Sequence, residues 1–117
     1  MPKPPAISEP FTPLLCPAHP KTTLAMEGCF EKSILKTDRA IDARAKTIFG
    51  LLLPAVRSEF VQSEGSWLRY RRSSCATEAS RYQGGSFQPV SFASCEVSRN
   101  RSHLNDLAEL RHTLRFH

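Results

Sequence analysis

Four cysteines are the side chains of this chain with the most evident covalent chemistry: Cys16, Cys29, Cys75 and Cys95. An even number of cysteines in a small domain favours two disulfide bonds, and four cysteines allow three connectivities. Bonds between sequence neighbours, Cys16 with Cys29 and Cys75 with Cys95, need the least rearrangement of the chain. If these bonds form, the protein functions in an oxidising compartment, because cytosolic thiols are kept reduced.

A zinc site is the alternative use of these residues. The segment Cys16-Pro-Ala-His19 has a spacing typical of zinc ligands, and Cys29 with one later cysteine would complete a tetrahedral set. The sequence lacks a second closely spaced ligand pair, so we favour disulfides and expect no metal and no other cofactor. All four histidines are interpreted by default as surface residues: His19, His103, His112 and His117.

Motifs of catalytic sites are missing from the sequence. It contains no G-x-S-x-G, no H-E-x-x-H and no phosphate-binding glycine loop, and Gly84-Gly85 is too short to hold a nucleotide. We therefore predict a binding protein that is not an enzyme and has no small-molecule substrate.

The net charge of +5 indicates acidic partners, and three arginines, Arg69, Arg71 and Arg72, lie close to Trp67. Basic and aromatic residues mixed in this way are typical of nucleic-acid surfaces. On a helix, however, Arg71 shares a face with Trp67 while Arg69 and Arg72 point elsewhere. A solvated basic face is therefore the favoured interpretation, and a cytosolic nucleic-acid-binding protein is the third hypothesis for function.

Three helices must position these side chains, over residues 23–52, 55–80 and 87–114, because apolar residues recur there at helical spacing. Pro54 ends the first helix, and Gly84-Gly85 permits the positive dihedral angles that a chain reversal often needs. The predicted fold is all-α: three long helices in a disulfide-stapled antiparallel hairpin or bundle. The second helix is expected to bury Val56, Phe60, Trp67 and Cys75. The proline-rich residues 1–15 are predicted to be a flexible extension.

Two charged residues interrupt the apolar faces of the first two helices. Asp38 lies between Ile34 and Ile41, and Arg71 lies between Trp67 and Cys75. Counted from the turn near residue 53, the two come within about one helical turn, roughly 5 Å along the axis. They form a buried ion pair, since unpaired buried charges are costly, or both extend to solvent at a helix edge. Asn100 reaches a similar level on the third helix.

These positions carry a resemblance to the LprI-like lysozyme inhibitors, a family of small bacterial cell-envelope domains. Trp67, Arg71 and Cys75 match the tryptophan, arginine and cysteine of the family's central helix motif, and Asp38 fits its D-x-x-L pattern. The likeness extends over about residues 16–107, and we assign residues 16–115 to the family's helical domain. The family's cysteine pattern implies the same neighbour pairing. Gly84 and Gly85 form the break between the second and third helices.

The resemblance implies a protein that covers or plugs the substrate cleft of a lysozyme, and another envelope protein is the alternative partner. An exposed loop with aromatic anchors would suit this role, and the residues that we select for it are Arg81, Tyr82 and Phe87. Many lysozymes are basic, so a net charge of +5 counts against electrostatic attraction. The alternative function is an envelope interaction or scaffold domain with a different ligand.

The resemblance and the cysteines indicate a periplasmic or extracellular protein. Residues 1–20 contain no apolar core of a signal peptide. We therefore expect a leader upstream of Met1 in preference to a cytosolic chain. No apolar run is long enough to predict a transmembrane segment.

Overall fold

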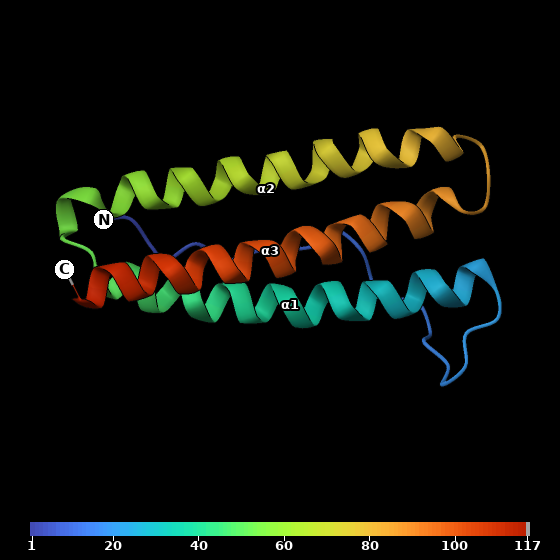
Figure 1. Ribbon diagram of the computed structural model, residues 1–117, viewed down its shortest axis with the longest axis horizontal. Coiled ribbons are helices and arrows are strands. Elements are labelled where there is room, and N and C mark those ends of the chain that lie inside the picture. The colour runs from blue at the N-terminus through green and yellow to red at the C-terminus, as the bar shows by residue number, and fades with distance from the viewer. Residues whose placement is uncertain (117) are drawn as a thin grey trace.

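The computed structural model describes residues 1–116 of the 117-residue chain. It contains α1 (Thr23–Leu51), a short 3-10 turn η1 (Pro54–Val56), α2 (Arg57–Ala79), a second turn η2 (Ser80–Tyr82) and α3 (Gln88–Phe116). Each helix runs opposite to the one before it, and all three lie along the long axis of the molecule (Figure 1). The predicted all-α bundle is confirmed, and each predicted helix boundary agrees with the structure to within a few residues.

Local signals in the sequence explain where the helices begin and end. The Thr22 hydroxyl accepts a hydrogen bond from the Ala25 amide at 3.0 Å, which caps the first turn of α1. After α1 the chain becomes extended at Leu52 and Leu53, before Pro54 starts the next turn. At the other end of the molecule, Gly84 has a φ of +80°, as the predicted chain reversal requires.

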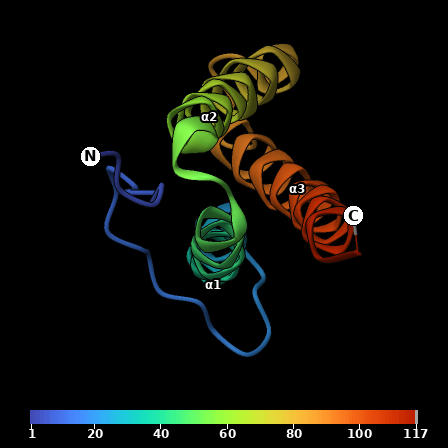
Figure 2. The same ribbon diagram turned by 90° about the vertical axis from the view of Figure 1, so that its left-hand side faces the viewer.

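The helix α3 packs against both other helices, and the view along the bundle shows the three in a triangular arrangement (Figure 2). Buried apolar side chains form two clusters, one on either side of a polar layer around Arg71. The first cluster consists of Ile41, Ala45, Ile48, Phe49, Phe60 and Leu107. The second consists of Ile34, Ala93 and Val97. Val56, predicted to be buried, is 37% exposed because it lies in the turn η1 and not on the inner face of α2.

Residues 1–15 lie along α1 and α2, on the side away from α3 (Figure 2). The Ile7 amide donates to Asp42 Oδ1 at 2.9 Å, and the Leu14 amide donates to Glu31 Oε1 at 3.0 Å. A Cβ at Gly28 would overlap the backbone oxygen of Leu15, so this glycine permits the close approach. That the segment is flexible stays a prediction. These contacts give it a defined position against α1.

None of the helices within residues 1–116 combines the length and the apolar character that a membrane crossing requires.

Candidate functional site

Two disulfides cross-link the end of the bundle that contains the turn between α2 and α3. Cys16 bonds Cys29 and Cys75 bonds Cys95, with Cα atoms 4.6 and 5.5 Å apart, which confirms the predicted pairing. The first bond attaches the N-terminal segment to α1, and the second joins α2 to α3. The zinc alternative is wrong, because the sulfurs of Cys16 and Cys29 are bonded to each other.

Arg71 occupies the centre of the bundle and is fully buried. Its Nη1 donates to Asp38 Oδ1 and to Asn100 Oδ1, both at 3.0 Å. Its Nη2 donates to Glu9 Oε2 at 2.8 Å, and its Nε lies 3.1 Å from Glu96 Oε2. Of the two sequence interpretations, the ion pair of Asp38 with Arg71 is the one that the structure confirms.

Glu9 and Glu96 are partners of Arg71 that were not predicted from the sequence. Glu9 lies in the proline-rich segment, where no periodic pattern predicts a contact with a residue 62 positions away. Glu96 carried a usable signal, because it follows Ala93 by three residues and precedes Asn100 by four on the inner face of α3. A search for polar residues at core spacing would have found it.

Three carboxylates and one guanidinium leave an excess of negative charge in this polar layer. Burial, reinforced by the hydrogen bond and charge of Glu9, raises the pKa of Asp38 to about 7. Burial opposes ionisation of Glu9, but hydrogen bonds with Asp38 and Arg71 lower its pKa overall. Within residues 1–116, Asp38 Oδ2 is buried with no donor group bonded to it. A proton held between Glu9 and Asp38 would satisfy this oxygen and remove one negative charge.

A second polar pair lies one turn further along the bundle. His103 Nε2 is 2.6 Å from Glu64 Oε2, and the Trp67 ring stacks on the imidazole with centroids 3.8 Å apart. The surface interpretation of His103 is therefore wrong. The residue follows Asn100 by three positions and precedes Leu107 by four, which places it on the buried face of α3. His19 and His112 are exposed, and His117 lies outside the described residues.

The arginines near Trp67 separate as their helical phase predicts. Arg71 is buried, whereas Arg69 and Arg72 are exposed on other faces of α2. The Arg69 guanidinium donates to the Ser66 hydroxyl at 3.1 Å. These three side chains therefore do not form one continuous basic surface.

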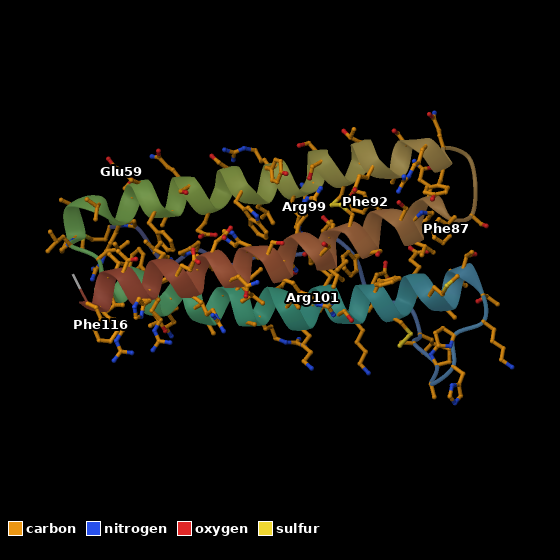
Figure 3. The ribbon with its side chains drawn as sticks, viewed as in Figure 1. Glu59, Phe87, Phe92, Arg99, Arg101 and Phe116 are labelled. Carbon is orange, nitrogen blue, oxygen red and sulfur yellow. A yellow bond between two sulfur atoms is a disulfide. The ribbon has the colours of Figure 1, made fainter. Side chains whose placement is uncertain are left out.

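The turn over residues 81–87 presents the aromatic anchors predicted for partner binding. The Tyr82 and Phe87 rings meet edge to face with centroids 4.9 Å apart, and the Arg81 guanidinium lies 5.2 Å from the centre of the Tyr82 ring. Phe87 is 40% exposed at the start of α3, at one end of the bundle (Figure 3). The three side chains orient one another, and their contact with a partner stays a prediction.

Comparison with known proteins gives one match. The family described as "Lysozyme inhibitor LprI" matches residues 16–107, a span that includes both disulfides and Arg71. No curated protein and no solved structure matches the chain.

Proposed function

The chain belongs to the family of LprI lysozyme inhibitors, and we propose that it is an exported bacterial envelope protein that inhibits a lysozyme by binding to it. The family match carries this proposal, because it covers most of the chain and spans all three helices. An inhibitor of this kind needs a rigid surface that covers the enzyme's cleft, and it needs no catalytic residue of its own.

Two disulfides support a periplasmic or extracellular location. Such bonds persist in oxidising compartments and are rare in the cytosol. Cys75 and Cys95 also hold together the two helices that flank the turn over residues 81–87. A turn held in this way loses little conformational freedom on binding, which favours affinity.

We propose the turn over residues 81–87 as a contact with the enzyme. Aromatic side chains and arginine dominate the energetics of many protein interfaces, and this turn carries Arg81, Tyr82 and Phe87 at the end of a rigid scaffold. Loops on rigid scaffolds are where binding residues concentrate.

A lysis assay tests the function. Purified oxidised protein should slow the clearing of a peptidoglycan suspension by at least one class of lysozyme. Phe87→Ala should weaken inhibition about tenfold, as expected for loss of an aromatic anchor. Phe116→Ala is the matched control, because Phe116 is also exposed but lies at the opposite end of the bundle (Figure 3). Unchanged lysis with several lysozyme classes, at a large excess of folded inhibitor, would reject the proposal.

The alternative function is an envelope interaction domain for an anionic ligand, which the net charge of +5 favours. Salt-sensitive binding to anionic envelope polymers, together with unchanged lysis, would identify that function.

A further inference from the structure

An open groove with a volume of about 400 Å³ lies towards the end of the bundle that carries the turn over residues 81–87, although none of these seven residues lines it. One wall comes from α1, the other from α2, and α3 contributes from Gln88 to Glu96. Residues 9–11 of the N-terminal segment also line it. Most of the surface is apolar and includes Phe11, Ile34, Ala76, Ala79 and Phe92. Phe92, which belongs to α3, lies near the turn end of the bundle (Figure 3).

The α1 wall of the groove carries two carboxylates that lack a cation. Glu27 and Glu31 are four residues apart, so they share one face of the helix. Within residues 1–116 neither forms an ion pair with a basic side chain. Glu31 is 9% exposed and accepts the Leu14 amide. Burial raises the pKa of Glu27, and the charge and hydrogen bond of Glu31 raise it further.

The groove has the opposite charge to the chain as a whole. Four glutamates and one arginine line it, whereas the whole chain carries a net charge of +5. Two of these glutamates, Glu9 and Glu96, are already engaged with Arg71. Glu27, which is partly exposed, therefore provides the negative charge that can meet a cation, and the buried Glu31 lies one helical turn from it. A basic protein with an acidic groove can attract a basic partner locally, despite its own net charge.

We propose that this groove docks a basic, apolar polypeptide segment, in which a lysine or arginine lies next to an aliphatic side chain. The aliphatic group would lie against Ala76 and Phe92, and the cation would reach Glu27. This inference deepens the proposed function and rests on it for the source of the segment, which is the surface of the inhibited lysozyme. Arg81, Tyr82 and Phe87 line a separate hollow on another face of α3, so a partner that touches both surfaces must extend around this end of the bundle.

Calorimetry of the oxidised, full-length protein tests the groove without the enzyme. The probe is a synthetic peptide of alternating leucine and lysine, and the control peptide has glutamate in place of lysine. The lysine peptide should bind with an affinity that falls as salt rises, because charge attraction is screened. The glutamate peptide should not bind. Equal binding of both peptides, or of neither, would overturn the proposal.

Two pairs of variants locate the binding. Glu27→Gln should weaken binding of the lysine peptide about fivefold, while Glu109→Gln, which makes the same charge change at an exposed site outside the groove, should leave it unchanged. Ala76→Trp should fill the groove and weaken binding at least about tenfold. Ser73→Trp is its control, since Ser73 is an exposed residue of α2 that does not line the groove. Equal effects of a variant and its control would overturn the proposal.

The same variants in the lysis assay separate this inference from the proposed function. If lysozyme is inhibited equally well by Glu27→Gln, Ala76→Trp and the unmodified protein, the groove proposal is wrong and the proposed function stands. If the peptide binds as expected but no lysozyme is inhibited, the groove stands and the proposed function is wrong.

Sedimentation of the protein alone tests whether a second copy of the chain occupies the groove. A dimer that Ala76→Trp dissociates would assign the groove to a second copy of the chain and overturn the proposal.

Discussion

Around Arg71, three carboxylates lie within 3.1 Å of one guanidinium, and all four side chains are at most 5% exposed, so we call this set the closed layer. Two turns towards the N-terminus of α1, Glu27 and Glu31 line an open groove, and within residues 1–116 no basic side chain pairs with either. Both regions contain carboxylates, but only the region around Arg71 also contains a cation that pairs with them. Charges that are matched inside the protein hold the helices in register. Charges that are left unmatched at a surface cost some stability and are available to a partner.

The largest expected effect comes from removing the cation of the closed layer. Arg71→Met should lower the free energy of unfolding by about 3–5 kcal/mol, because it leaves buried carboxylates without a partner. Urea unfolding of the oxidised protein measures the loss. Arg69→Met, at an exposed position of α2, should change stability by less than about 0.5 kcal/mol.

Adding Asp38→Leu to Arg71→Met should recover only part of the lost free energy of unfolding. Glu9 and Glu96 would remain buried without the guanidinium. The double variant should still be more stable than the sum of the two single changes predicts. A loss below about 1 kcal/mol for Arg71→Met would show that the layer is not closed as described.

Removing a disulfide should cause the next largest loss of stability. The two bonds differ in the elements that they join. Replacing either pair by alanine should cost about 3 kcal/mol in chain entropy, since the closed loops span 13 and 20 residues. Removing Cys75 and Cys95 should cost more, because both are buried and their loss leaves space in the core. Removing this second pair should also weaken inhibition more than removing the first, since it holds α2 and α3 on both sides of the turn over residues 81–87. Equal losses of stability and of inhibition for the two pairs would contradict this distinction.

A smaller effect tests how the N-terminal segment closes onto α1. Gly28→Ala should destabilise the protein by about 1–3 kcal/mol, because the new Cβ would meet the backbone of Leu14 and Leu15. Gly50→Ala is the matched control, since nothing lies within 4 Å of a Cβ at that helical position. It should stabilise α1 by up to about 1 kcal/mol through helix propensity. Thermal unfolding distinguishes the two, and a stabilising Gly28→Ala would show that the segment does not lie against α1.

The last prediction concerns how stability depends on the proton of the closed layer. Because the pKa of Asp38 is raised from its ordinary value to about 7, the folded protein binds more protons than the unfolded chain between these values. The stability that Asp38 contributes is therefore complete in acid and is lost as pH rises through about 7. One group of this kind gives a slope of at most about 1.4 kcal/mol per pH unit.

Urea unfolding between pH 5 and pH 8 measures this dependence. Asp38→Asn should reduce the decline, because an amide does not titrate, while Glu27, Asp42 and Glu96, whose pKa values burial also raises, are retained. Asp106→Asn, at an exposed position of α3, should retain it. The same slope in both variants would place the titrating group elsewhere.

The sequence predicts the helices and the Asp38–Arg71 pair because both follow from spacing along continuous helices. Apolar periodicity marks α1, α2 and α3, and counting from the turn near residue 53 brings the two charges to one level. His103 and Glu64 carried the same kind of signal, since each lies at core spacing on its helix. The default interpretation of histidines as surface residues concealed it for His103.

Contacts of the N-terminal segment could not be predicted in this way. Glu9 and Ile7 lie in an irregular, proline-rich stretch, and their partners are 62 and 35 residues away. No periodic pattern fixes the side of the bundle to which such a segment docks. The groove depends on the same placement, because Phe11 and Glu9 line it. Its acidic character therefore emerges only when the segment, α1 and α3 are in place.

We propose that a lysozyme binds the end of the bundle that carries the turn over residues 81–87 and the acidic groove. Hydrogen–deuterium exchange of the oxidised protein, with and without an inhibited lysozyme, tests this most directly. Exchange should slow over residues 24–31 and 76–93 and stay unchanged over residues 44–60 and 104–116, at the opposite end. Slowing confined to the opposite end, while lysis is inhibited, would contradict this mode of binding.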